Sequence, residues 1–261
     1  MTMKQRNIWF VIVTYRPERV LLVKLRKALE GWPVVIVDNT TINTGFGAGA
    51  NRGMEEAFAA GAQWAVVCNQ DIRLTGQQIT HFCAIAQKCD PGIVGPEAGN
   101  LDHQRWTTIL NENEREFHKA TPSNKLHGGL EKPDYISGSM MAMQKNVWEK
   151  IGGFYEPYFM YYEDADLSVR AKNAGFTLRE ITLDGYRHES AGVAQYREAK
   201  EYYLARNHLL FVRRLAPLRV KIHEFLRLPK SLAEHHAHGN TEAIRGIGDF
   251  AKGIFGRMDT P

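Results

Sequence analysis

The sequence predicts an α/β fold in which a mainly parallel sheet carries helices on both faces. Short runs of β-branched and aromatic residues alternate with longer segments of helical spacing, and Gly or Pro separates them. The predicted strands over 7–14 and 33–37 are almost wholly apolar, as expected for strands buried on both faces. From residue 198 onward the pattern becomes helical and basic, which predicts a C-terminal helical appendage.

The first half of the chain continues this alternation. We expect helices over 18–30, 50–60 and 75–88, with further strands over 64–68 and 93–95. Thr75 and Gln78 form the S/T-x-x-E/Q pattern that caps the start of a helix. Asp38 and Asp71 end the second and third strands, and ligands of parallel sheets bind beyond such strand ends. Both aspartates are therefore candidate binding residues.

The second half is less regular. Residues 97–133 lack a clear period, so we expect an irregular insertion there. Beyond it we expect a strand pair or bend around Gly138, helices over 146–151 and 166–174, and a strand over 177–183. Pro217 and Pro229 are expected to divide the basic tail into short helices, because proline interrupts a helix.

Composition and charge exclude several classes of protein. Of the 261 residues, 44% are hydrophobic and 24% charged, as in ordinary globular proteins. The three cysteines suit neither a disulfide framework nor a zinc site, which favours a reducing cytoplasm. No signal peptide is expected, and no apolar run reaches the roughly 20 residues that span a bilayer. From Lys200 there are 11 Lys and Arg against 6 Asp and Glu, so the basic character belongs to the tail and nucleic acid is not an expected partner.

The segment 161–170 holds the densest group of acids. Three carboxylates within four positions repel one another unless a cation, a helix N-terminus or an arginine absorbs the charge. Asp166 and Arg170 stand at i, i+4 and are expected to pair within a helix. Glu163 and Asp164 would then precede the first turn and face a cleft, although acids are also common structural residues at a helix start.

The glycine-rich segment 43–53 allows a different interpretation. Gly45 to Ala50 matches the G-x-G-x-x-A fingerprint of dinucleotide-binding folds, and a strand ending in Asp71 follows. In that fingerprint the glycines come directly after a strand, whereas here Asp38–Thr44 intervene. An NAD(P)-dependent oxidoreductase is therefore a weaker alternative.

Taken in order, these segments resemble the family-2 glycosyltransferases with the GT-A fold, especially the rhamnosyltransferase-like branch. The matching segments are Val13–Tyr15, Val37–Asn39, Asn43–Gly53, Asn69–Asp71, Ser137–Met141, Gly152–Glu156, Phe159–Arg170 and Arg187–Gly192. The resemblance implies a Rossmann-like GT-A catalytic domain over 1–197. Its nucleotide-binding half would cover about 1–96 and its acceptor half about 134–197, with the helical region at 198–261.

The resemblance also implies roles for individual residues. The implied nucleotide-binding residues are Thr14, Tyr15, Asp38, Asn39, Gly45, Asn51 and Asn69. The implied acceptor and sugar residues are Gly138, Ser139, Tyr162 and Arg170. Asp164 would be the catalytic base with Glu163 beside it, and Asp71 and His188 would bind Mg²⁺ or Mn²⁺.

Two departures from the family pattern matter. The family usually has a further helix and strand between the Val-Asp-Asn and Asn-x-Gly segments, whereas only Thr40–Ile42 intervene here, so we expect a trimmed sheet edge. In the metal motif, Asn69 replaces an aspartate found in some members and Gln70 replaces a common proline. Asp71 is then the only acid, and a catalytically inactive nucleotide-sugar-binding protein remains an alternative.

Together these features predict an inverting, metal-dependent glycosyltransferase of cell-surface polysaccharide biosynthesis. It would move a sugar, with rhamnose favoured, from a dTDP- or UDP-sugar to a hydroxyl of a glycan or lipid-linked acceptor. The tail over 208–232 interleaves basic and apolar residues. We expect it to contact the inner face of the cell membrane peripherally, to form a homodimer or to pack on the catalytic domain.

Overall fold

The computed structural model describes residues 7–97, 135–188 and 197–258. The helices are α2 (Arg19–Ala28), α3 (Phe46–Ala59), α4 (Gly76–Ala86), α6 (Lys145–Ile151), the 3-10 turn η2 (Glu156–Tyr158), α7 (Glu163–Asn173), α8 (Arg197–Leu215), α9 (Leu218–Ala237) and α10 (Thr241–Lys252). The strands are β1 (Ile8–Thr14), β2 (Val34–Asp38), β3 (Trp64–Asn69), β4 (Ile72–Arg73), β5 (Gly92–Pro96), β6 (Met140–Gln144), β7 (Thr177–Ile181) and β8 (Arg187–His188). The insertion expected over 97–133 lies, apart from Glu97, outside the described residues.

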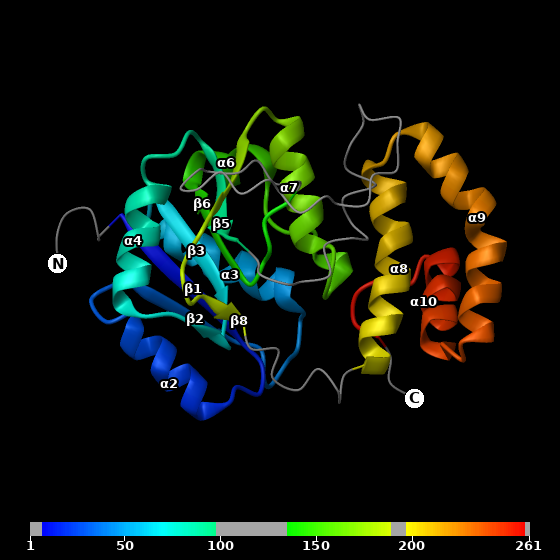
Figure 1. Ribbon diagram of the computed structural model, residues 1–261, viewed down its shortest axis with the longest axis horizontal. Coiled ribbons are helices and arrows are strands. Elements are labelled where there is room, and N and C mark those ends of the chain that lie inside the picture. The colour runs from blue at the N-terminus through cyan, green and yellow to red at the C-terminus, as the bar shows by residue number, and fades with distance from the viewer. Residues whose placement is uncertain (1–6, 98–134, 189–196, 259–261) are drawn as a thin grey trace.

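The central sheet has the order β2-β1-β3-β6-β5-β7 (Figure 1). β1 pairs in parallel with β2 and β3, and β5 pairs in parallel with β7. β6 runs antiparallel between β3 and β5, so the predicted mixed, mainly parallel sheet is confirmed. Within the described residues β2 forms one edge, which agrees with the trimmed edge expected from the short connection after Asp38.

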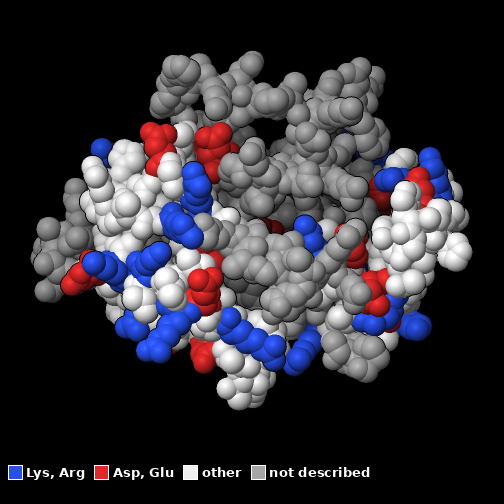
Figure 2. Space-filling view, turned by 60° about the horizontal axis from the view of Figure 1, so that its bottom comes forward, with Lys and Arg blue, Asp and Glu red and all other residues white. Residues whose placement is uncertain are grey.

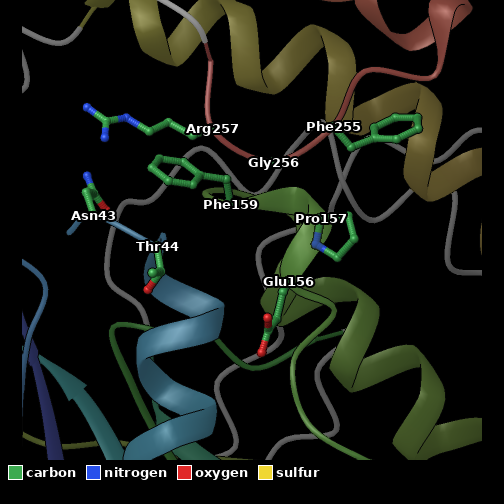
Figure 3. Close-up of a pocket in the computed structure, with 8 residues that line it drawn as sticks. All are labelled: Asn43, Thr44, Glu156, Pro157, Phe159, Phe255, Gly256 and Arg257. Atoms are coloured by element: carbon green, nitrogen blue, oxygen red, sulfur yellow. The ribbon is translucent and has the colours of Figure 1, made fainter.

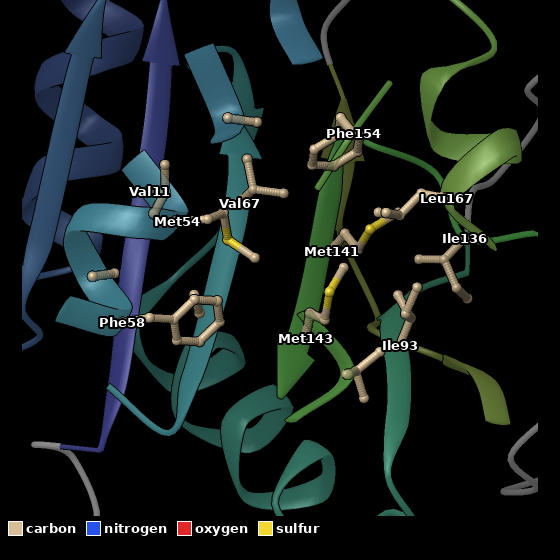
Figure 4. Packing of buried hydrophobic residues seen from close by; sticks show 14 of the residues in the cluster. Val11, Met54, Phe58, Val67, Ile93, Ile136, Met141, Met143, Phe154 and Leu167 are labelled. Carbon is tan, nitrogen blue, oxygen red and sulfur yellow. The ribbon is translucent and has the colours of Figure 1, made fainter. Parts of the chain in front are cut away.

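Alternating side chains of the strands build a core on each face of the sheet. Along β1, Phe10 and Ile12 pack with α2 and α4, whereas Val11 and Val13 pack with α3. Figure 4 shows Val11 close to Met54 of α3, on the face that α3, α6 and α7 cover. This two-sided burial explains the near-continuous apolar character of the strands.

The glycine-rich segment is helical from Phe46, so the expected loop before a helix at 50–60 is wrong. A Cβ at Gly49 would lie 2.7 Å from Val13 Cγ1. A Cβ at Gly53 would lie 2.9 Å from Val37 Cγ2 and closer still to Val11. The glycines let α3 lie directly on the sheet, and this packing overrides their low helix propensity.

Three further expectations need correction or support. α7 begins at Glu163 rather than at residue 166, because Tyr162 takes a left-handed conformation with φ 79° and caps the helix there. Of the strand pair or bend expected around Gly138, the structure has the bend, a turn at 138–139 that leads into the single strand β6 from Met140. The capping box of Thr75 and Gln78 is confirmed.

α8 lies beside α7, and α9 and α10 pack against each other and against α8 (Figure 1). Pro217 separates α8 from α9 as expected, but Pro229 lies inside α9 and does not end it. No residue of α9 is buried, so the carbonyl that loses its N–H partner at Pro229 can bond to water, which lowers the penalty for the proline. Among the described helices, none combines the length and apolar character that crossing a bilayer requires.

We predict opposite stability effects for one substitution in two helices. Gly53→Ala should destabilise the protein by about 1–3 kcal/mol, because the added methyl group collides with Val11 and Val37. Gly248→Ala in α10 is the matched control, since a Cβ there has no neighbour within 4 Å. It should stabilise the protein by about 0.5–1 kcal/mol through helix propensity. Urea unfolding would measure both, and equal effects would contradict the close packing of α3.

Candidate active site

Gln70 joins the carboxyl ends of two central strands. Its Oε1 accepts the backbone N–H of Tyr15 at 2.8 Å, and its Nε2 donates to the carbonyl of Tyr15 at 3.0 Å. The side-chain amide thus forms the same pair of hydrogen bonds with the Tyr15 backbone that a residue of a neighbouring strand would form. These bonds hold the end of β1 beside the end of β3. From sequence, Gln70 was only a departure from the family pattern, and the structure gives it this role.

Asp71 and His188 meet at the same end of β3. The pairing of β4 with β8 places Ile72 opposite His188, which brings the two residues together from distant parts of the chain. His188 Nε2 lies 3.2 Å from Asp71 Oδ1 and 3.0 Å from Asn69 Nδ2. His188 Nδ1 is buried and has no hydrogen-bond partner.

This geometry fits a divalent cation. His188 Nε2 has one in-plane lone pair, which either accepts from Asn69 or faces a cation held together with the carboxylate of Asp71. The described residues contain no cluster of three or more acidic, His or Cys side chains around this point. Asp71 and His188 therefore suit a cation that takes its remaining ligands from phosphate oxygens and water.

Asp164 lies in the first turn of α7 and is partly exposed. Its Oδ2 accepts the backbone N–H of Gly138 at 2.9 Å, and its Oδ1 accepts that of Ala165 at 2.8 Å. Ser139 follows Gly138 in the chain, and its backbone carbonyl accepts the backbone N–H of Asn69 at 2.9 Å. The expected base, the small-residue segment and the metal motif are therefore neighbours.

Two hydroxyl groups fix the Ser139 side chain. It lies 3.0 Å from the Ser137 hydroxyl and 2.9 Å from that of Tyr186. Tyr186 was not foreseen from sequence, since a single tyrosine in a loop carries no pattern. Burial raises the pKa of Tyr186 to about 12, so it remains a neutral hydrogen-bonding group.

Glu163 differs from Asp164 in its surroundings. The expectation that both acids precede the helix is wrong, because both lie in the first turn of α7, and Glu163, at 6% exposed, does not face a cleft. Among the described residues its Oε2 has no hydrogen-bond partner, and its side chain lies next to Gly47 of α3. Loss of solvent, with the neighbouring charge of Asp164 adding to it, raises the pKa of Glu163 to about 8. At neutral pH Glu163 is therefore mainly protonated and neutral.

Of the expected nucleotide residues, Asp38 is exposed and the others are partly or fully buried. Hydrogen bonds from Thr40 hold the pKa of Asp38 below its ordinary value. Thr14 is buried, and its hydroxyl donates to Val37 O at 3.4 Å. Tyr15 is half-buried, with the guanidinium of Arg16 over its ring at 5.4 Å. Contacts of these residues with a nucleotide stay predictions.

Two buried asparagines organise backbone around the expected nucleotide segment. Asn39 donates to the carbonyl of Gly45 at 2.9 Å and accepts from Arg52 at 2.6 Å. Asn51 both donates to the Phe154 carbonyl at 3.0 Å and accepts the Phe154 N–H at 2.8 Å. Their polar groups are engaged within the protein, and direct ligand contacts from them stay predictions.

The predicted pair of Asp166 and Arg170 is confirmed, with Arg170 Nε 2.6 Å from the carboxylate. Asp166 is fully buried and also receives Arg214 Nε at 2.9 Å and the Tyr158 hydroxyl at 3.1 Å. Arg170 also donates to the carbonyls of Ile151 and Gly153. The guanidinium expected to bind sugar or acceptor thus holds the Gly152–Glu156 segment, and contact with a ligand stays a prediction.

The segment before α7 is strained. Phe159, Tyr161 and Tyr162 have φ values of 66°, 65° and 79°, the left-handed region that non-glycine residues rarely adopt. The carbonyl of Phe159 accepts the N–H of Phe46, which begins α3. Gly45 has no room for a side chain there, since a Cβ would collide with Phe159. Such strain is found at functional sites, where surrounding contacts maintain it.

A cavity of about 430 Å³ opens beside this segment (Figure 3). Asn43 and Thr44 line one side, Glu156, Pro157 and Phe159 another and Phe255 to Arg257 a third. The C-terminal end of the described chain thus shares a cavity with the expected nucleotide segment.

We predict that the difference in unfolding free energy between Glu163→Gln and wild type depends on pH. Its raised pKa means that the folded protein binds the proton more tightly than the unfolded chain. The stability this contributes is complete below pH 4.5 and is lost as the pH rises through about 8. Glu163→Gln copies the neutral form, so relative to wild type it should gain at least about 1 kcal/mol between pH 5 and pH 9.

Urea unfolding at each pH measures this difference. Glu149→Gln on the exposed side of α6 is the matched control and should show no such trend. A difference between Glu163→Gln and wild type that does not change with pH would mean that Glu163 is charged in the folded protein.

Comparison with known proteins agrees with the resemblance seen in the motifs. No family model matches the chain. The chain is 27% identical to N-acetylglucosaminyl-diphospho-decaprenol L-rhamnosyltransferase of Mycobacterium tuberculosis over 208 residues, covering 63% of this chain and 64% of that protein. It is 23% identical to dTDP-rhamnosyl transferase RfbF of Shigella flexneri, covering 84% of each protein. The resemblance to rhamnosyltransferase-like proteins is confirmed, although the chain spans less than two thirds of the first relative's length.

The solved structure of Staphylococcus aureus TarS residues 1–349 in complex with UDP-GlcNAc aligns with a TM-score of 0.53. The identity is 13%, and the alignment covers 95% of this chain and 81% of that one. This likeness concerns the fold, and it confirms the expected GT-A architecture.

Proposed function

We propose that the chain is a glycosyltransferase that moves a sugar, with rhamnose favoured, from a dTDP- or UDP-sugar to a hydroxyl group of a cell-surface glycan or lipid-linked acceptor. The names of the relatives from Mycobacterium tuberculosis and Shigella flexneri support this class of reaction. The observation that carries the proposal is the continuous set of contacts from Asp71 through His188, Asn69 and Ser139 to Gly138 and Asp164. An accessible carboxylate near a site suited to a diphosphate supports sugar transfer.

In the proposed reaction Asp164 acts as general base. It takes the proton of the acceptor hydroxyl while the oxygen forms a bond to the anomeric carbon, and the bond from that carbon to the nucleoside diphosphate breaks. Attack and departure on opposite sides invert the anomeric centre in one displacement. Asp71 and His188 would hold Mg²⁺ or Mn²⁺, which supplies positive charge next to the leaving diphosphate when bound.

The oxidoreductase alternative is not favoured. The glycines of the fingerprint match lie within or at the start of α3 and face protein atoms, as Gly49 faces Val13 and Asn39. A pyrophosphate needs such glycines at an open strand-to-helix turn. The inactive-binding-protein alternative is distinguished by a turnover assay.

The first test of this function is Asp164→Asn. Its turnover should fall by about 10²-fold or more with dTDP- or UDP-sugar donors, because the amide cannot accept the hydroxyl proton. Donor binding, measured by calorimetry, should persist. The matched control Asp90→Asn changes an exposed aspartate before the amino end of β5, at the opposite end of the strands from the candidate site, and should keep full turnover. Activity of Asp164→Asn within a few-fold of wild type would place the base elsewhere.

A second test concerns the cation. EDTA should abolish transfer, and Mn²⁺ or Mg²⁺ should restore it. Asp71→Ala should weaken Mn²⁺ binding in calorimetry by about tenfold or more, and His188→Ala should do so less strongly, since hard cations prefer carboxylate. His81→Ala on the exposed side of α4 is the control for loss of a histidine. Full transfer in chelator would show that protein groups alone stabilise the diphosphate.

We further propose that α9 contacts the inner face of the cell membrane. Leu218, Ile222, Phe225 and Leu226 follow one another at helical spacing and are 51–75% exposed. The same helix carries Arg219, Lys221, Arg227 and Lys230. At the right-hand end of Figure 2, where α9 lies in Figure 1, uncharged surface is bordered by basic and some acidic side chains. Such a surface suits anionic headgroups and would bring the enzyme to a lipid-linked acceptor.

Vesicle co-sedimentation tests this contact. The protein should bind vesicles containing phosphatidylglycerol at low salt and be released at high salt. Joint replacement of Phe225 and Leu226 by Ser should lower binding by about tenfold or more. Val23→Ser is the control, since Val23 is also an exposed apolar residue, on α2. Equal recovery with anionic and neutral vesicles would refute membrane binding, and a dimer that this double variant dissociates would then explain the exposed face.

A further inference from the structure

The strained segment 158–162 connects both sides of the candidate site. The segment leads directly into Glu163 and Asp164, so its backbone conformation determines the position of the proposed base. At its other contact, the carbonyl of Phe159 accepts the N–H of Phe46 at 2.9 Å, at the start of α3. A change in this segment would therefore move the base and the expected nucleotide segment relative to each other.

Asn207 of α8 is aimed at this segment. Its Nδ2 lies 2.9 Å from the carbonyl oxygen of Tyr158, 2.7 Å from that of Met160 and 2.9 Å from that of Tyr161. The side chain is fully buried, so water does not compete for these carbonyls. One amide group thus holds three carbonyls in the part of the chain where the left-handed residues lie.

Arg206 orients that amide. Its Nε donates to Asn207 Oδ1 at 3.0 Å, which fixes the opposite, donating end of the amide towards the loop. Its two terminal nitrogens donate to the carbonyl of Tyr158 at 2.9 Å and to that of Gly256 at 2.8 Å. Like Asn207, Arg206 is fully buried, and the rings of Tyr202 and Tyr203 flank its guanidinium.

His208 continues the same set of contacts. Its Nε2 lies 3.0 Å from Glu224 Oε2, and its Nδ1 lies 3.0 Å from the hydroxyl of Tyr162, the residue that caps α7. Three consecutive residues of α8 therefore bind the segment that precedes the base.

We propose that Asn207, oriented by Arg206, is a positioning residue for sugar transfer. This inference rests on the proposed function. Left-handed residues other than glycine persist only where surrounding contacts maintain them. Without the donors of Asn207, the segment relaxes and the start of α7 moves with it. Because a small misplacement of a reacting group slows catalysis strongly, this acts on the chemical step more than on donor binding.

The test is Asn207→Asp, which keeps the size of the side chain and removes both donors. It should lower kcat by about 10²-fold while the donor KM stays within about threefold. The control is Ile247→Ala in α10, a buried residue away from the segment, which lowers stability but should keep kcat within about threefold. Arg206→Lys, which retains the charge but loses the Nε donor to Asn207, should lower kcat by about tenfold. Arg206→Lys tests the proposal if Asn207→Asp does not fold.

Hydrogen exchange supplies a measurement that does not depend on activity. Asn207→Asp should speed exchange over 158–166 and at the amide of Phe46, and leave β1 and β3 unchanged. Unchanged exchange over 158–166, or a kcat within about threefold of Ile247→Ala under conditions where both are folded, would overturn the proposal. If wild type transfers no sugar, the proposed function fails, and the exchange experiment still decides whether Asn207 holds the segment.

Discussion

The buried carboxylate of Asp166 is the interaction on which the arrangement of the candidate site depends. A charge removed from water destabilises the protein by several kcal/mol unless partners compensate it, and here Arg170, Arg214 and Tyr158 all do so. Each partner belongs to a different part of the chain. One charge therefore joins α7 to α8 and to Tyr158 at the start of the strained segment, and Arg170 extends the connection to the loop after α6.

Much of the sheet was predictable, because burial on both faces leaves a strong apolar signal in β1 and β3. The capping box at Thr75 was predictable for a local reason, since both of its hydrogen bonds lie within four residues. The helical glycines of α3 were not, because their conformation is decided by the distance to Val13 and Val37 in other elements. The continuation of α9 through Pro229 was missed for a similar reason, as it depends on exposure to solvent.

The candidate site, like the fold, was predictable from sequence only in part. The motif order placed Asp71, His188 and Asp164 at one end of the sheet, and the structure brings Asp71 and His188 into contact. Which acid of the adjacent pair meets solvent depends on the left-handed turn at Tyr162, and no residue preference signals such a turn at a tyrosine. A signal did exist for Arg206 and Asn207, since a polar pair within the otherwise apolar and aromatic run from Tyr202 to Phe211 indicates an internal role.

The contacts of α8 with the 158–162 segment also bear on how enzymes of this kind can diverge. Composition changes sharply near residue 198, and a boundary there suggests a C-terminal part that could be exchanged as a module. The backbone carbonyls that Asn207 binds lie before that boundary, and their donors lie after it. A chimera joined at 198 would retain both halves of this contact only if its parents share the same turn. Recombination that redirects such an enzyme to a new acceptor would therefore have to inherit the turn and α8 together.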